Sequence, residues 1–176
     1  MTPLAYSDAA IGKILAEVKV IAMVGASPKD SRPSYFVMKY LIAKGFRVVP
    51  VNPGQAGQSI LGQPCYADLA AIPEPIDMVD IFRSSEAVPG IVDAALALDP
   101  KPKVIWTQLG VRHEGAAAKA EAAGLTVIMD RCPKIEYARL SGEIGWNGIN
   151  SRVLSSKKPA MRAGFQSYGL RVPKAD

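Results

Sequence analysis

The chain has 176 residues, of which 49% are hydrophobic and 21% are charged, and its formal net charge is +5. This composition is typical of one globular domain with a buried core, and it excludes collagen-like, low-complexity and disulfide-rich proteins. No apolar run approaches the roughly twenty residues that a membrane span needs, and the first residues do not resemble a secretory signal. We therefore expect a cytoplasmic protein without a membrane span.

The positive charge is concentrated near the end of the chain. Residues 1–150 contain 15 basic and 15 acidic residues, whereas residues 151–176 contain six basic residues and only Asp176 as an acid. We predict one domain over residues 1–145 and a basic tail or extension over residues 146–176. Such a tail can contact nucleic acid, but a solvated tail is the simpler interpretation, and we expect no nucleic-acid partner. Two cysteines, Cys65 and Cys132, support neither a disulfide framework nor a zinc site.

Helical and strand patterns alternate along the chain from residue 7 onward. Short apolar runs are typical of strands buried in a parallel sheet, and apolar stripes between capping residues and glycine are typical of helices. In chain order we predict a helix from Ser7 or Asp8 to Val18, a strand over 20–24, a helix from near Pro33 to Gly45, strands over 46–51 and 76–82, a helix from Ser84 or Ser85 to Leu98, a strand over 104–106, a helix over 113–123 and a strand over 125–129. These elements predict an α/β fold: a single doubly wound, Rossmann-like domain with five parallel strands in the order 3-2-1-4-5 and helices on both faces.

The polar loop over residues 25–34 is the most informative part of this pattern, because it joins a buried strand to the start of a helix. Gly25 ends the strand, and Pro33 suits the first turn of a helix, where its missing N–H is not needed. Free N–H groups and the positive end of the helix dipole favour an anion there, and Lys29 and Arg32 add positive charge. The loop therefore predicts a site for a phosphate or diphosphate.

In a doubly wound sheet the ligand lies outside the carboxyl ends of the strands. Small and polar residues gather at all of these ends in the predicted sheet. The loops concerned cover residues 25–34, 52–54, 82–84, 108–110 and 130–133. Taken alone, a loop such as 52–54 is as readily explained as a simple turn, but five such loops at one edge indicate a binding site.

Known nucleotide motifs are absent from this edge. A dinucleotide fingerprint requires three glycines in G-x-G-x-x-G and an acidic residue after the second strand, but this chain has Gly25 alone and Asn52 in place of the acid. The G-x-x-x-x-G-K-[ST] phosphate loop is also missing. NAD and ATP are therefore disfavoured, and a ligand with a differently placed diphosphate and an additional phosphate is favoured.

The sequence resembles the stand-alone bacterial coenzyme A-binding proteins, which are similar to the amino-terminal domain of the succinyl-CoA synthetase alpha subunit. The resemblance covers about residues 8–140 and rests on residues 24–28 with 32–34, on residues 51–53 and on residues 129–136. It implies that the loop over residues 25–34 holds the CoA phosphates, and that Phe82, Arg83 and residues 108–110 border the adenosine or the pantetheine arm. An aromatic or apolar wall and positive side chains suit that ligand.

On these grounds we predict coenzyme A or an acyl-CoA as the cofactor. The candidate cofactor-binding residues are Gly25, Ala26, Ser27, Pro28, Lys29, Arg32, Ser34, Asn52, Pro53, Phe82, Arg83, Gln108, Gly110 and Cys132. The Ser27 and Ser34 hydroxyl groups are expected to assist with hydrogen bonds. We predict no metal site and no catalytic residue.

The catalytic part of the ligase resemblance does not extend to this chain. Succinyl-CoA synthetase passes phosphate through a histidine in a second domain, whereas the single histidine here, His113, stands at a predicted helix start. It could reach a ligand at the edge, but a solvent-facing histidine is the favoured interpretation. We therefore interpret the protein as a binding or regulatory module rather than an enzyme. The alternatives are an NAD(P)-dependent oxidoreductase and a CoA-binding subunit that works with a separate ligase partner, and a homo-oligomer is also compatible with the sequence.

Three further side chains with reactive or ionisable groups lie at or just after the last predicted strand. Cys132 follows Arg131 at a strand end, where a positive neighbour and a helix start would lower the pKa of the thiol and place it near the CoA thiol arm. A mixed disulfide with CoA is the functional hypothesis, and a partly buried side chain closing the sheet is the favoured one. Asp130 and Glu136 are interpreted as a strand-end residue and a helix-surface charge rather than as an acid pair.

Overall fold

The computed structural model describes residues 4–143. These residues belong to two compact units, the first formed by residue 4 and residues 18–132, and the second by residues 5–17 and 133–143. The predicted basic tail over residues 146–176 lies outside the described residues. Within the described part of the chain, no helix combines the length and the apolar character needed to cross a membrane.

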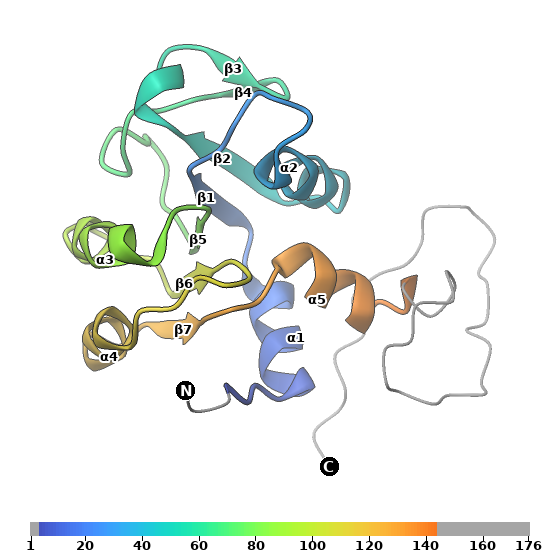
Figure 1. Ribbon diagram of the computed structural model, residues 1–176, viewed down its shortest axis with the longest axis vertical. Coiled ribbons are helices and arrows are strands. Elements are labelled where there is room, and N and C mark those ends of the chain that lie inside the picture. Colours follow the sequence, from blue (N-terminus) through green and yellow to red (C-terminus); the bar gives the residue numbers. More distant parts are fainter. Residues whose placement is uncertain (1–3, 144–176) are drawn as a thin grey trace. The chain divides into compact units, whose positions relative to one another are not determined.

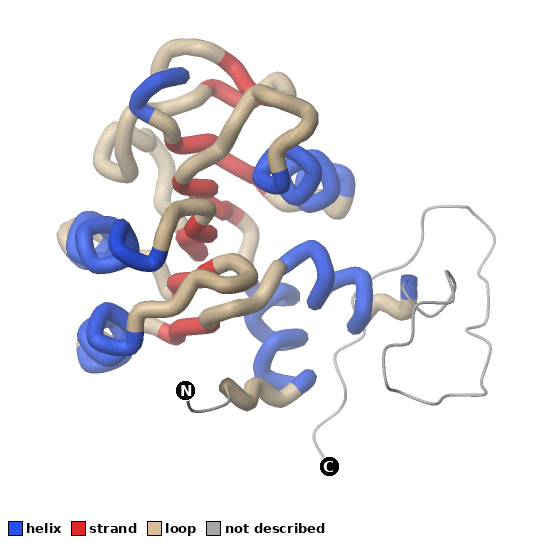
Figure 2. Tube along the Cα trace, viewed as in Figure 1, coloured by secondary structure: helices blue, strands red, loops and turns tan. Residues whose placement is uncertain are grey.

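The first unit is a five-stranded parallel sheet with helices on both faces (Figures 1 and 2). Its strands are β1 (Val20–Val24), β2 (Arg47–Val51), β5 (Met78–Ile81), β6 (Val104–Thr107) and β7 (Thr126–Ile128). Helix α2 (Pro33–Ala43) lies on one face, and helices α3 (Val88–Leu96) and α4 (Glu114–Ala122) lie on the other. The predicted α/β class, the five parallel strands and the helices on both faces are confirmed.

The predicted strand order 3-2-1-4-5 is wrong. The third of the five strands, β5, pairs with β1 rather than with β2, so the order along the sheet is β2-β1-β5-β6-β7. Pro50 shows why, because its backbone faces the outer side of β2, where its carbonyl accepts from Tyr66 N–H at 3.0 Å. Proline has no N–H for a further strand on that side, so it is tolerated at a sheet edge but not in an interior strand.

Residues between β2 and β5 form short elements that the sequence patterns did not predict. They are a 3-10 turn, η1 (Pro53–Gln55), and the hairpin of β3 (Ser59–Ile60) and β4 (Gln63–Pro64). The hairpin turn has Leu61 and Gly62 with φ of 51° and 75°. Two central residues with positive φ match the right-handed twist of a hairpin, but leucine is an unusual choice there, and the usual Asn-Gly signal is absent.

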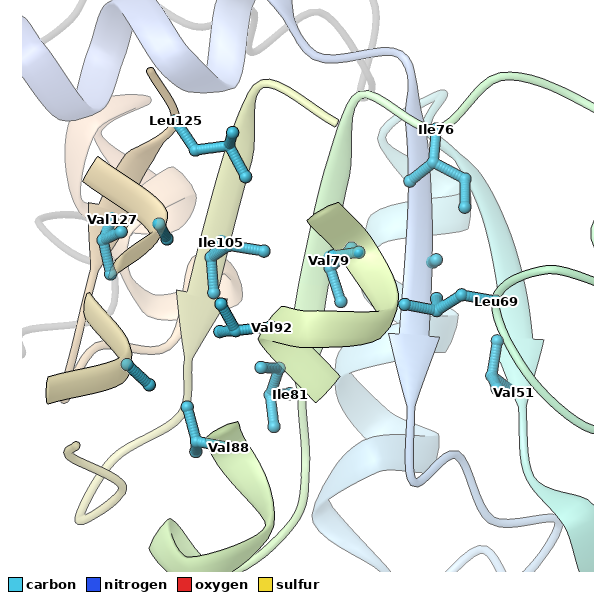
Figure 3. Close-up of a cluster of buried hydrophobic side chains, with 14 of the residues drawn as sticks. Val51, Leu69, Ile76, Val79, Ile81, Val88, Val92, Ile105, Leu125 and Val127 are labelled. Carbon is cyan, nitrogen blue, oxygen red and sulfur yellow. The ribbon is translucent and has the colours of Figure 1, made fainter. Parts of the chain in front are cut away.

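One hydrophobic cluster fills the space between the sheet and the helices α3 and α4 (Figure 3). Alternate residues of each central strand point into it, including Val79 and Ile81 of β5 and Ile105 of β6, and α3 contributes Val88 and Val92. Helix α3 begins after a 3-10 turn, η2 (Ser85–Ala87). The helix predicted to start at Ser84 or Ser85 therefore consists of this turn followed by α3. Burial on both faces explains why the strands are apolar runs without alternation.

The second unit contains α1 (Asp8–Glu17) and α5 (Pro133–Leu140). Arg139 joins these helices, because its guanidinium contacts both Asp8 carboxylate oxygens at 2.7 and 2.9 Å and Glu136 Oε2 at 2.7 Å. The hydrogen bonds from Arg139 lower the pKa of Asp8. Glu136 is buried, so the prediction of a helix-surface charge at this position is wrong. A buried carboxylate requires such a partner to offset its loss of hydration.

Candidate functional site

The strand order places a topological switch point between β1 and β5. The connection from β1 runs through α2 on one face of the sheet, and the connection from β5 runs through α3 on the opposite face. The loops that follow β1 and β5 therefore separate at the carboxyl edge of the sheet. Ligands of open α/β sheets bind outside this kind of edge. The candidate site is the edge formed by these two loops and by the loops after β2, β6 and β7.

Gly25 allows the loops after β1 and β5 to approach closely. Its φ is +90°, and a Cβ atom at this position would lie 2.5 Å from the carbonyl oxygen of Phe82 and 3.0 Å from Cδ of Arg83. Its N–H donates to Val51 O at 2.9 Å, and Phe82 N–H donates to Val24 O at 2.8 Å. Both the positive φ and the contact exclude a side chain, so the glycine predicted to end the strand is required by the backbone geometry.

Asn52 organises the same loops rather than projecting freely from them. Its Nδ2 donates to the buried Ala26 carbonyl at 2.8 Å, and its Oδ1 accepts from Gly54 N–H at 2.9 Å. Pro53, exposed, opens the 3-10 turn η1 at this point. Both ends of the Asn52 amide are therefore used in positioning the backbone. An acidic residue in its place could not donate to Ala26 O, which explains why the dinucleotide pattern fails here.

The start of α2 carries uncompensated positive charge. Arg32 is the N-cap residue and its side chain makes no capping hydrogen bond, while Pro33 follows it in the first turn. Ser27 Oγ accepts from Lys29 N–H at 3.2 Å, and Ser34 is buried. Lys29, Arg32 and Arg83 are exposed, and their cationic groups contact no acidic side chain among the described residues, although Asp30 lies in the same loop. Exposed Pro28 completes this loop. A helix start with unpaired cations favours a polyanion.

The loop after β6 is held by the loop after β7. Gly110, with φ of 76°, donates its N–H to Asp130 Oδ1 at 2.7 Å. Thr107 Oγ1 donates to Val111 O at 2.6 Å and accepts from Asp130 N–H at 3.3 Å. These bonds fix the intervening Leu109, whose side chain is 58% exposed at the edge of the sheet. Asp130 is therefore a loop-anchoring residue, consistent with its interpretation as a strand-end residue.

A buried carboxyl group lies behind this edge. Asp80, in β5, is fully buried, and its Oδ1 accepts from Gln108 Nε2 at 2.8 Å. Its Oδ2 has no hydrogen-bond partner among residues 4–143. Burial raises the pKa of Asp80 to about 7, and the hydrogen bond from Gln108 opposes that rise. Sequence reasoning selected Gln108 but missed Asp80, although an acid in the middle of an apolar strand was a usable signal.

Cys132 is a buried side chain, and His113 caps a helix. Cys132 is buried, as the favoured interpretation of this residue expected. His113 is the N-cap residue of α4, where its Nδ1 accepts from Ala116 N–H at 3.0 Å. The imidazole is therefore engaged with the helix backbone and is not simply solvent-facing. Within residues 4–143, histidine, cysteine and carboxylate side chains do not gather in threes as a metal site would need.

The family described as the CoA binding domain has a model that matches residues 19–138, which include every loop of the candidate site. The chain belongs to this family. The uncharacterized protein YneT of Bacillus subtilis is 39% identical over 132 residues, a match that covers 75% of this chain and 95% of YneT.

Two further relatives differ from each other in length. The solved structure of a hypothetical protein from Pyrococcus horikoshii has a TM-score of 0.72 and 36% identity, and the match covers 80% of this chain and 99% of that chain. Acetate–CoA ligase (ADP-forming) I of Archaeoglobus fulgidus is 30% identical over 149 residues, which are 79% of this chain but 21% of the ligase. The chain is thus similar over most of its length both to short proteins, which it covers almost completely, and to one part of a much longer ligase.

Proposed function

We propose that this member of the CoA-binding domain family binds coenzyme A or an acyl-CoA at the carboxyl edge of its sheet. The phosphates would lie at the start of α2, near Lys29, Arg32 and Arg83. The observation that carries the proposal is the presence of these exposed cations, without acidic partners among the described residues, around an uncapped helix start. The diphosphate and 3′-phosphate of CoA would supply the negative charge that balances these cations.

The remaining parts of the ligand are proposed to lie along the neighbouring loops. Phe82 and Arg83 follow β5, and Gln108 and Gly110 follow β6, so they are the residues available to the adenosine or the pantetheine arm. The half-exposed Leu109 and Phe36, at 58% and 52%, add apolar surface. Burying such surface against a ligand is favourable.

Calorimetric titration with CoA, dephospho-CoA and NAD⁺ tests this proposal. We expect saturable binding of CoA, weaker binding of dephospho-CoA and no binding of NAD⁺. Arg32→Ala should weaken CoA binding roughly tenfold, the effect of losing one hydrogen bond to a charged group. The matched control is Lys39→Ala, which removes an exposed cation from the same helix away from its start. Equal losses from both variants, or binding of NAD⁺ alone, would contradict the proposed site.

We also propose that the protein acts as a binding or regulatory module. Its one histidine caps α4, which supports a structural rather than a chemical role for that residue. The similarity to one part of a CoA ligase suggests a second arrangement, in which the chain supplies the CoA site to a separate ligase partner. Co-purification from its own cells with and without CoA separates the two: a stable complex with a nucleotide-binding ligase chain supports the second arrangement.

A further inference from the structure

Asp80 and Gln108 form a buried polar pair directly behind the proposed ligand edge. In the sheet, Asp80 lies between Met23 of β1 and Trp106 of β6, neither of which is charged. Gln108 is the first residue after β6, and its Nε2 donates to Asp80 Oδ1 at 2.8 Å. The two residues are 28 positions apart in the chain, and the register of β5 and β6 brings them together.

The pair uses only one end of the Gln108 amide. Among the described residues, no donor reaches Gln108 Oε1. In the same part of the chain, Asp80 Oδ2 is the only fully buried side-chain nitrogen or oxygen atom that lacks a hydrogen-bond partner. Gln108 Oε1 is therefore not fully buried, although Gln108 as a whole is only 8% exposed. The Gln108 backbone is held by bonds to Ile81 O at 3.4 Å and from Val111 N–H at 2.9 Å. With the backbone held, Asp80 decides which end of the amide faces outward.

Two orientations of the amide follow from the chemistry of a carboxyl group. An ionised carboxylate only accepts hydrogen bonds, so Gln108 Nε2 must face it and Oε1 turns outward. A protonated carboxyl group can donate to Oε1, in which case the NH₂ group turns outward instead. Because Asp80 Oδ2 has no partner in the described part of the chain, the charged form lacks there the second hydrogen bond that would stabilise it.

We propose that Asp80 is a positioning residue that turns Gln108 Oε1 toward the bound ligand as an acceptor for one of its hydrogen-bond donors. This inference rests on the proposed binding of CoA at this edge. CoA offers such donors in the amide N–H groups of its pantetheine arm and in the amino group of its adenine. The site thus prefers a ligand with an N–H donor at this position, and protonation of Asp80 weakens that preference.

Neighbouring charges do not complicate the titration. Burial raises the pKa of Asp80 and the Gln108 hydrogen bond opposes that rise, and neither of these influences is a charged group. The buried residues of α2, on the same face of the sheet, are also uncharged. Protonation of Asp80 near neutral pH is therefore governed by the pair itself.

The test compares CoA binding, by calorimetry, in the wild type, Asp80→Leu, Asp80→Asn, Gln108→Met and the double variant Asp80→Leu/Gln108→Met. Asp80→Leu should weaken binding roughly three- to tenfold, the effect of one lost hydrogen bond. Asp80→Asn should restore it only in part, because an amide, like a protonated carboxyl group, can accept from Gln108 Nε2 but can also donate to Oε1. The double variant should bind no more weakly than Gln108→Met, since both changes remove one interaction.

Two further readouts separate positioning from a merely structural role. The side-chain amide signal of Gln108 in ¹⁵N NMR, assigned by its absence in Gln108→Met, should shift with pH near 7 in the ligand-free wild type and stay constant in Asp80→Asn. The ratio of wild-type to Asp80→Asn affinity should fall as the pH is lowered from 8 to 6, and the titration of the CoA phosphates cancels in this ratio. Adenosine 3′,5′-bisphosphate, which lacks the pantetheine arm, identifies the donor: an Asp80→Leu effect that persists with this ligand assigns it to adenine, and one that vanishes assigns it to the arm.

Results that contradict the positioning role differ from results that contradict CoA binding itself. Wild-type affinity retained in Asp80→Leu but lost in Gln108→Met, or multiplied losses in the double variant, would overturn the positioning role and leave CoA binding intact. A wild type that binds no CoA would overturn the proposed function itself, and the inference with it.

Discussion

Asp80 should make the protein less stable as the pH rises, and Asp80→Asn should remove this dependence. The pKa of Asp80 is about 7 in the folded protein against 3.8 for the ordinary group, because full burial penalises the carboxylate. Well below pH 4 both the folded and the unfolded states hold the proton, so the shift contributes nothing there. Between pH 4 and 7 the folded state holds more protons than the unfolded state, so the free energy of unfolding falls with pH.

The size of the effect follows from the shift. About three pKa units at 1.36 kcal/mol each correspond to roughly 4 kcal/mol, fully expressed above pH 7. Asparagine is neutral at every pH, so the stability of Asp80→Asn relative to the wild type should increase by about this amount between pH 4 and 8. Urea unfolding at several pH values measures the difference, with the slope of free energy against urea checked for constancy.

Asp77 provides a control of opposite sign. Partial burial alone would raise its pKa, but hydrogen bonds from Val20 and Lys19 N–H and the charge of Lys103 outweigh burial and lower it. Its stabilising contribution is therefore present above the ordinary pKa and is lost only as the pH falls through the lower folded value. Asp77→Asn should thus be less stable than the wild type by a constant amount from pH 5 to 8. A stability difference for Asp80→Asn that is equally constant over this range would refute the reasoning.

Two further variants test local backbone requirements. Gly25→Ala should destabilise the protein by roughly 2–4 kcal/mol, because of its positive φ and the contact with Phe82 O, whereas Gly90→Ala, in α3 with open space around it, should stabilise it by about 0.5–1 kcal/mol in the same denaturation assay. Similar results for the two glycines would contradict the close approach of the β1 and β5 loops. His113→Ala should cost about 1 kcal/mol by removing the N-cap of α4, and His113→Asn should retain most of that stability; an alanine variant as stable as the wild type would show that the cap contributes little.

The sequence by itself determined the sheet-and-helix alternation and which loops gather at the edge that we propose as the binding site. Strands such as β1 are recognisable because burial on both faces requires an unbroken apolar run, and α2 is recognisable because Pro33 and Gly45 suit its ends. The same local signals placed Gly25, Lys29 and Arg32 in one loop before a helix. Such features depend on neighbours within a few residues, so they can be read without knowing the fold.

Only the tertiary structure decided which distant residues meet. The strand order depended on which edge of β2 carries no further strand of the sheet, and Pro50 gives that information only once its backbone direction is known. The pairing of Asp80 with Gln108 depended on the register between β5 and β6, and the burial of Glu136 depended on Arg139. The sequence does not show whether a charged residue is buried or which partner it has, because both follow from long-range packing. Packing therefore determines whether that charge lies on the surface, stabilises the fold or orients a neighbouring side chain.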